Sequence, residues 1–159
     1  APIPEEERGD VIAAYHRRLT SPDPTEQARF ARSWSIYECR VASLREDPNV
    51  AQLCADTDFT LPFARIEAHY FKHRGFLDDP EQLLRGAAQL SDIPTTIVHG
   101  RYDVICPVQN AWTLHGRMPH AELQIIPDAG HSAFEPGIIS ALVRARDGYL
   151  AGSSASSRI

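Results

Sequence analysis

Two short segments carry the side chains best suited to acid–base chemistry: Asp103, within residues 99–103 (His-Gly-Arg-Tyr-Asp), and His131, within residues 128–132 (Asp-Ala-Gly-His-Ser). A carboxylate beside a histidine accepts its Nδ1–H, fixes the tautomer of the ring and stabilises the imidazolium that forms when Nε2 takes a proton. Such a ring can deprotonate a serine hydroxyl and later protonate a leaving amine. We therefore predict that Asp103 and His131 are the acid and base of a hydrolytic site.

The residues around this pair predict the elements that position it. Residues 95–99 and 123–126 are short, β-branched or apolar runs bounded by proline or glycine, which is typical of buried strands. Helical apolar spacing fills residues 107–118 and returns after residue 138. Strand, helix, strand, helix predicts an α/β fold with two parallel strands and a right-handed crossover. Because two parallel strands do not make a stable sheet, we expect them to be one edge of a larger sheet.

The alternative is that Asp103 and His131 are unrelated turn residues. Their order, each directly after a predicted strand, favours the functional interpretation, and Gly130 permits a tight turn before the histidine. His99 is the competing histidine. Because it lies at a strand end beside Gly100, a structural hydrogen bond is favoured there over catalysis.

The part of the chain before residue 91 has helical spacing throughout. Predicted helices cover residues 5–19, 24–47, 50–55, 61–73 and 79–90. Residues 152–159 are rich in serine and are predicted to be disordered.

Two glutamates stand out on the predicted helices. Glu38 lies four residues after Trp34 at the border of an apolar stripe, and Glu67 lies four residues from both Phe63 and Phe71. Burial disfavours the charge of such a carboxylate, so it needs a cationic partner. One interpretation is an internal salt bridge, for which the candidate cations are Arg32, Arg40 and Arg65. The other is that both carboxylates face a pocket and bind the ammonium group of a ligand.

Composition and charge exclude several classes of protein. The chain has 159 residues, 43% of them hydrophobic and 23% charged, as in an ordinary globular domain. Its net charge of −5 gives no basic patch for nucleic acid, and no apolar run reaches the roughly 20 residues of a membrane-spanning helix. His69 and His73 could share a helix face, but no third ligand accompanies them. We expect no nucleic-acid partner, no membrane partner and no metal.

The cysteines are Cys39, Cys54 and Cys106. An odd count without a C-x-x-C pair argues against a disulfide framework and against a cysteine zinc site, and it is compatible with a reducing cytosol. The first residues lack the basic start and apolar middle of a signal peptide. We therefore expect a cytoplasmic protein.

Four segments together resemble the proline iminopeptidase (prolyl aminopeptidase) family of α/β-hydrolases, which remove an amino-terminal proline. They are residues 99–107 (HGRYDVICP), 127–132 (PDAGHS), 64–71 (ARIEAHYF) and 34–38 (WSIYE), and the resemblance extends over residues 2–150. It implies that the chain is the C-terminal part of an α/β-hydrolase fold, with a helical cap at 1–90 and the last strands and helices of the catalytic domain at 91–151.

The resemblance also implies roles for individual residues. Asp103 matches the acid of the family's catalytic triad and His131 its base. Glu38 and Glu67 match the cap carboxylates that hold the ammonium group of the substrate's proline. Two carboxylates in a poorly solvated cap repel unless a cation lies between them, and a protonated secondary amine is such a cation.

Two further residues, Ile105 and Cys106, match the family's small pocket for the pyrrolidine ring. The resemblance implies no metal and no organic cofactor. The nucleophilic serine of the family precedes the cap, and this chain contains no G-x-S-x-G motif; Ser132 lacks the strand-to-helix elbow that would let it substitute. We therefore expect the partners to be peptides with an N-terminal proline and the missing N-terminal half of the fold, and we expect the isolated chain to be inactive.

Two other functions remain open from the sequence. Another hydrolase of the same superfamily would keep Asp103 and His131 and give the cap glutamates structural roles. A non-catalytic helical module would bind an amine-bearing ligand or a partner protein.

Overall fold

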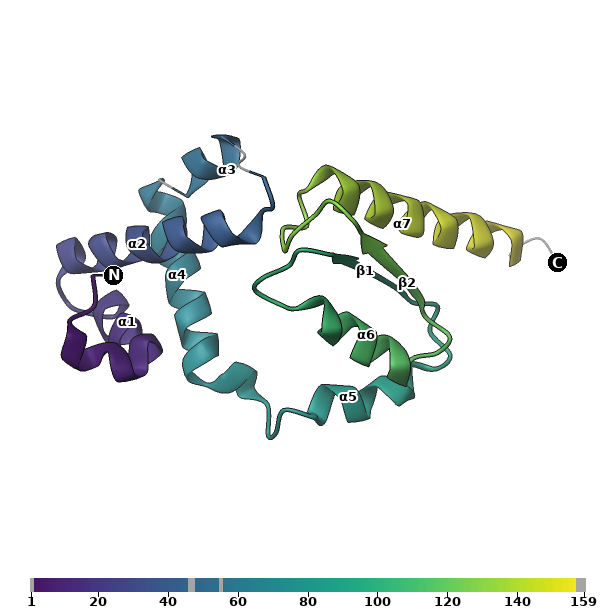
Figure 1. The fold of residues 1–159 in the computed structure, drawn as a ribbon, viewed down its shortest axis with the longest axis horizontal. Helices are drawn as coiled ribbons and strands as arrows, with labels where there is room; N and C mark the ends of the chain where they lie inside the picture. Colours follow the sequence, from purple (N-terminus) through teal and green to yellow (C-terminus); the bar gives the residue numbers. More distant parts are fainter. Residues whose placement is uncertain (1, 46–47, 55, 157–159) are drawn as a thin grey trace. The chain divides into compact units, whose positions relative to one another are not determined.

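The computed structural model describes residues 2–45, 48–54 and 56–156, with helices in the first part and a two-stranded sheet in the second (Figure 1). The chain divides into two compact units. We call Ala1–Arg40 together with Glu46–Asp78 the helical unit, and Val41–Arg45 together with Asp79–Ile159 the sheet unit.

The helical unit is built from capped helices. In chain order its elements are η1 (Glu5–Asp10), α1 (Val11–Leu19), α2 (Pro24–Ala42), α3 (Pro48–Leu53), α4 (Thr57–Lys72) and η2 (Arg74–Phe76). Helix α2 begins at Pro24, where the sequence predicts it, and the side chain of Asp23 accepts a hydrogen bond from the Thr25 N–H. Helix α4 begins earlier than the predicted residue 61, because Asp56 caps it by accepting from the Asp58 N–H.

One apolar core holds this unit together. Its buried residues are Ile3, Ala14, Tyr15, Leu19, Phe30, Ala31, Trp34, Ala64 and Ala68. The Tyr15 ring packs edge-on against Phe30 and Trp34, with centroids 5.7 and 5.1 Å apart. Ala64 and Ala68 are fully buried one turn apart on α4, so their small side chains let the neighbouring helix α1 approach closely.

The cysteines differ from expectation. Cys39 and Cys54 form a disulfide within the helical unit, and Cys106 is free and exposed. The expectation that the chain has no disulfide was therefore wrong. Two of the three cysteines form a pair, and the third keeps a free thiol. Because spacing in the sequence does not reveal which Cβ atoms meet, only the fold could bring this pair together.

The sheet unit has the predicted order of strand, helix, strand, helix. Its elements are α5 (Gln82–Gly86), η3 (Ala87–Leu90), β1 (Thr96–Gly100), α6 (Val108–Arg117), β2 (Glu122–Ile126) and α7 (Pro136–Ser156). Strands β1 and β2 pair in parallel, from Thr96 opposite Glu122 to Gly100 opposite Ile126. Figure 1 shows α6 and α7 on opposite sides of this sheet. None of the described helices is both long and apolar enough to cross a membrane.

Two expected boundaries differ from the structure. The predicted helical domain extended to residue 90, but α5 and η3 belong to the sheet unit, because buried Ala87 packs with Met118 and Ala121. The predicted disordered tail began at residue 152, whereas α7 continues to Ser156. The rest of that tail, residues 157–159, lies outside the described residues.

The carboxyl ends of the two strands approach each other very closely. The N–H of Arg101 donates to the Ile126 carbonyl and the N–H of Tyr102 donates to the Ala129 carbonyl, both at 2.9 Å. A Cβ atom added at Gly100 would lie 1.9 Å from the Gly130 carbonyl oxygen and 2.7 Å from that of Ala129. Glycine is therefore the only residue that fits at the end of β1 while the backbone at residues 129–130 keeps its position.

We predict that Gly100→Ala destabilises the chain by about 1–3 kcal/mol, the usual range for overpacking, because the new methyl group displaces the 129–130 backbone. Gly116→Ala is the matched control: it lies in α6 with nothing within 4 Å of the added Cβ, and we expect no loss of stability or a gain of about 0.5–1 kcal/mol. Urea unfolding of both variants checks this. Equal stabilities would contradict the proposed constraint.

Candidate active site

The structure brings the two predicted catalytic residues together. Asp103 follows β1 and His131 follows β2, so both lie beyond the carboxyl ends of adjacent parallel strands. The His131 Nδ1–H donates to Asp103 Oδ2 at 2.9 Å. With Nδ1 protonated, the neutral ring keeps its free electron pair on Nε2, so this nitrogen is the one that can accept a proton. The His131 side chain is 39% exposed, which leaves the ring accessible to a reacting group.

Backbone N–H groups hold the Asp103 carboxylate. Its side chain is only 3% exposed, and Oδ1 accepts from the N–H groups of Ile105 at 2.9 Å and Cys106 at 2.8 Å. Burial alone would raise the pKa of Asp103, but the hydrogen bonds from Cys106, His131 and Ile105 outweigh it and hold that pKa below its ordinary value. The carboxylate is therefore ionised and oriented when the ring of His131 takes up a proton.

His99 supports the same turn. Its Nε2 lies 2.9 Å from the Cys106 carbonyl, to which it donates, and 3.4 Å from Asp103 Oδ2. The ring therefore stabilises the turn from Asp103 to Cys106, in agreement with the structural role favoured from the sequence.

The turn places Ile105 and Cys106 beside the Asp103 carboxylate, which accepts hydrogen bonds from both of their backbone N–H groups. Lining of a substrate pocket by their side chains stays a prediction. Burial raises the pKa of the Cys106 thiol, and the nearby Asp103 charge raises it further. The thiol is therefore protonated at neutral pH, which makes it a poor nucleophile despite its exposure.

Ser132 is not arranged as a nucleophile. Its Oγ accepts a hydrogen bond from the Phe134 N–H at 3.2 Å, within the loop that leads into α7. Its backbone N–H donates to the Ala42 carbonyl. The side chain thus stabilises a local turn.

The two predicted binding glutamates lie in the helical unit, and Glu67 contacts the indole of Trp34. The Trp34 Nε1–H donates to Glu67 Oε2 at 2.7 Å, and the Trp34 ring also packs on Phe71, with centroids 6.0 Å apart. Glu38 lies one turn after Trp34 on α2, and both glutamates are half-buried. Arg65, one of the cations considered as a partner, donates from Nε to the Leu19 carbonyl at 2.7 Å.

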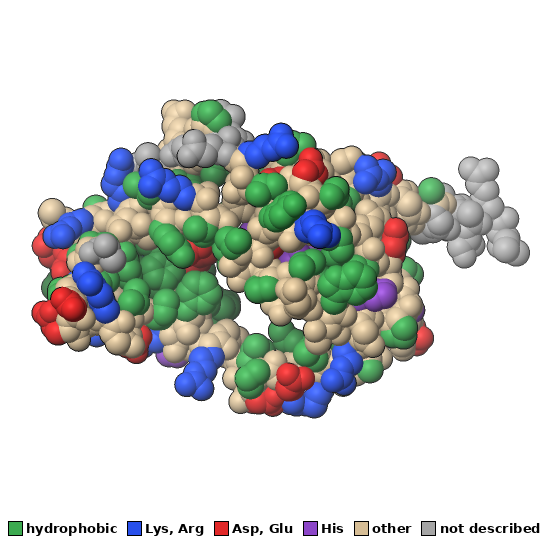
Figure 2. Space-filling view, viewed as in Figure 1, with side chains coloured by type: hydrophobic (Ala, Val, Ile, Leu, Met, Phe, Trp, Pro, Cys, Tyr) green, Lys and Arg blue, Asp and Glu red, His purple; other side chains and the backbone are tan. Residues whose placement is uncertain are grey.

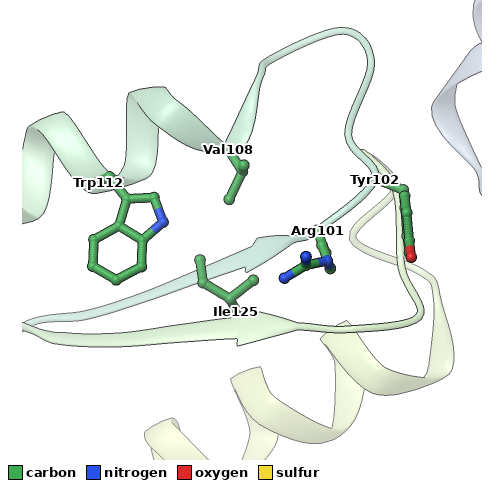
Figure 3. A pocket seen from close by; sticks show the side chains of 5 residues that line it. All are labelled: Arg101, Tyr102, Val108, Trp112 and Ile125. Atoms are coloured by element: carbon green, nitrogen blue, oxygen red, sulfur yellow. The ribbon is translucent and has the colours of Figure 1, made fainter.

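A separate apolar hollow lies on the sheet unit. It has a volume of about 430 Å³ and is lined by Arg101, Tyr102, Val108, Trp112 and Ile125 (Figure 3). Trp112 and Tyr102 are 58% and 53% exposed, and Figure 2 shows further hydrophobic side chains on the surface of the chain. The hollow contains none of the six predicted site residues. It is formed by residues of β2, of α6 and of the loop that follows β1.

Sequence patterns did not indicate which residues hold the loop that carries His131. The N–H groups of His131 and Ser132 both donate to the Ala42 carbonyl, at 2.8 Å each. Glu135, 8% exposed, accepts from the Gly130 N–H at 2.6 Å. Near this loop, an acidic residue before Pro136 is typical of a helix start. This pattern does not reveal that the same residue contacts residues 42–44. Among the described residues, no group of three side chains is arranged to hold a metal ion.

Asp103 predicts a specific dependence of stability on pH. Because its pKa is lowered in the folded state, its contribution is complete above the unfolded-state pKa of about 3.9 and is lost as the pH falls through the folded-state value. We predict that Asp103→Asn destabilises the sheet unit at neutral pH, and that the difference from the native chain narrows below about pH 4. Urea unfolding across this range measures it, with the exposed Asp147→Asn as control. A difference that does not change with pH would contradict the assignment.

Comparison with known proteins places this geometry in a family. Residues 20–138 match the alpha/beta hydrolase fold family. The chain is 51% identical over 147 residues to the proline iminopeptidase of Xanthomonas citri, covering 92% of this chain and 47% of that protein. It is 49% identical over 150 residues to a probable proline iminopeptidase of Leptolyngbya boryana, covering 94% and 47%. It is 49% identical over 146 residues to the proline iminopeptidase of Arabidopsis thaliana, covering 91% and 38%.

The chain thus spans about half the length, or less, of these relatives. The match of residues 20–138 covers the elements from α2 to β2, together with the Asp103–His131 pair. The chain belongs to the alpha/beta-hydrolase family.

Proposed function

We propose that this chain supplies the acid–base pair and the amine-binding carboxylates of a serine aminopeptidase that releases an N-terminal proline from peptides. The observation that carries the proposal is the 2.9 Å hydrogen bond between His131 Nδ1 and Asp103 Oδ2. The names of the similar proteins support the proline specificity. We also propose that this activity is cytoplasmic.

In this reaction His131 Nε2 takes the proton of a serine hydroxyl that another stretch of polypeptide supplies. The serine oxygen attacks the carbonyl carbon of the proline residue, and Asp103 stabilises the imidazolium that results. His131 then donates its proton to the nitrogen of the leaving peptide, and an acyl-serine ester remains. Water, deprotonated by the same ring, hydrolyses the ester and releases proline.

Specificity for a free proline terminus rests on Glu38 and Glu67. The Trp34 N–H bond to Glu67 orients its carboxylate and stabilises the negative charge, to which the secondary ammonium group would bind. A blocked terminus removes the cation between the two carboxylates, so blocked peptides bind poorly. We propose that Ile105 and Cys106 line the compartment for the pyrrolidine ring and that the helical unit is the cap domain.

The partner in this proposal is the missing N-terminal half of the fold. Parallel sheets are normally covered on both faces and have several strands, whereas the sheet unit has two described strands and an exposed hollow around Trp112. The additional strands would cover that hollow and bring the serine with its oxyanion-binding N–H groups.

Reassembly tests this function. We expect that joining the chain to the N-terminal half of the Xanthomonas citri relative gives a protein that cleaves a proline arylamide, measured by release of the chromophore. His131→Ala in the same protein should lower kcat by about a thousandfold or more, because the serine then lacks its base. A correctly folded but inactive reassembled protein would overturn the proposal.

Glu67→Gln tests the amine-binding role in the same reassembled protein. Removing a charged hydrogen-bonding partner worth about 1.5–3 kcal/mol should lower kcat/KM for the proline arylamide by about 10- to 100-fold. Simple esters without an amine should lose less than about threefold, and the exposed Glu6→Gln is the matched control. Equal losses on both substrates would instead favour a general esterase or amidase in which Glu67 is structural.

A further inference from the structure

Glu135 is a buried carboxylate for which the proposed mechanism has no use. It is 8% exposed and directly precedes Pro136, the first residue of α7. Its own carbonyl accepts the Ile139 N–H at 2.9 Å, so its backbone begins the helix. A helix start does not require a buried charge, because a serine or threonine would cap it as well.

Both oxygens of this carboxylate accept backbone N–H groups from segments far apart in the chain. Oε1 accepts from Gly130 at 2.6 Å, immediately before His131, and Oε2 accepts from Leu44 at 3.3 Å. Leu44 lies in the Val41–Arg45 segment of the sheet unit. The carboxylate therefore connects this segment to the loop that carries the catalytic ring.

A second connection lies beside the first. The Ala42 carbonyl accepts the N–H groups of both His131 and Ser132 at 2.8 Å, and the Glu135 N–H donates back to the Ser132 carbonyl at 3.2 Å. The backbone at residues 130–132 is thus held by hydrogen bonds to both Ala42 and Glu135.

The space around this loop allows little adjustment. A Cβ atom at Gly130 would lie 3.1 Å from the Leu44 nitrogen and 3.2 Å from both the Ala42 oxygen and Glu135 Oε1. Because both carboxylate oxygens face N–H donors, a glutamine at position 135 would direct its NH₂ group against one of them. The site is therefore specific for a group that only accepts hydrogen bonds.

We propose that Glu135 is a positioning residue for His131: with the Ala42 carbonyl, it holds the 130–132 backbone against Val41–Arg45 so that the imidazole stays aligned on Asp103. The inference rests on the proposed function only in taking His131 as the catalytic base. Glu135 touches neither the ring nor the reacting atoms and acts through the backbone.

Proton NMR of the whole 159-residue chain tests the inference. A proton shared between an imidazole nitrogen and a carboxylate resonates far downfield of amide protons, so the His131 Nδ1–H gives its own signal. In Glu135→Gln we expect this proton to exchange with water at least about tenfold faster, with a similar increase at the Gly130 and Leu44 amides. The amides that pair β1 with β2 should keep their protection. Glu122→Gln, an exposed carboxylate on β2 whose Oε1 accepts from the Gln124 side chain, is the matched control and should change none of these rates.

Two results would overturn the inference. An unchanged Nδ1–H signal in Glu135→Gln would show that the ring does not depend on this carboxylate. Loss of protection throughout β1 and β2, or an unfolded variant, would show that Glu135 supports the sheet unit in general and has no specific effect on the loop. The exchange rates of the Nδ1–H and of the backbone amides can both be measured without the nucleophilic serine, which this chain does not supply. An inactive reassembled enzyme alongside the expected NMR result would therefore reject the proposed function and leave Glu135 as a positioning residue.

Discussion

The close approach of two backbone segments at the end of the sheet is the constraint on which the site depends. The 2.9 Å hydrogen bond from His131 Nδ1 to Asp103 Oδ2 requires the loops after two different strands to lie next to each other. Parallel pairing brings Gly100 opposite Ile126, and the missing side chain at Gly100 then lets the two loops contact each other through their carbonyl and N–H groups. The geometry of the side chains is thus a consequence of backbone contact. A bulkier residue at position 100 would separate the loops before any catalytic group was altered.

Two buried carboxylates stabilise this arrangement in the same way. Among the described residues, no lysine or arginine side chain donates a hydrogen bond to Asp103 or to Glu135. Each accepts backbone N–H groups, from Ile105 and Cys106 in the first case and from Gly130 and Leu44 in the second. Hydrogen bonds to an ionised acceptor are stronger than those between neutral groups, and an unpaired charge in such a place would be costly. Each carboxylate therefore holds in place the loop whose N–H groups donate to it. The loops around Asp103 and His131 are thus stabilised by hydrogen bonds to backbone N–H groups.

Sequence patterns predicted the elements better than the contacts between them. Short β-branched or apolar runs and helical spacing located β1, α6 and β2, because each signal is local. The disulfide could not be predicted, since its formation depends on where the fold places Cys39 and Cys54. The flanking aromatic residues at Glu67 correctly indicated a half-buried carboxylate. One of its partners is the neutral N–H of Trp34, which a search for cations overlooks. Glu135 and Leu44 are 91 residues apart, and no spacing rule connects a carboxylate with a backbone N–H at such a distance.

The end of α2 explains why the Val41–Arg45 segment belongs to the sheet unit. The last four carbonyl groups of a helix accept no N–H from within the helix, so they need hydrogen-bond donors from other segments. Ala42 is the last residue of α2, and its carbonyl receives the N–H groups of His131 and Ser132, which in a loop have no strand or helix partner of their own. The helix end and the loop that carries His131 thus satisfy each other's backbone groups, and the Glu135 carboxylate accepts the N–H groups of Leu44 and Gly130. Separating the two segments would leave unpaired acceptors on one side and unpaired donors on the other. The position of His131 is therefore stabilised by the same hydrogen-bonding requirements that every folded backbone must meet, and these act at the point where the ring must be held.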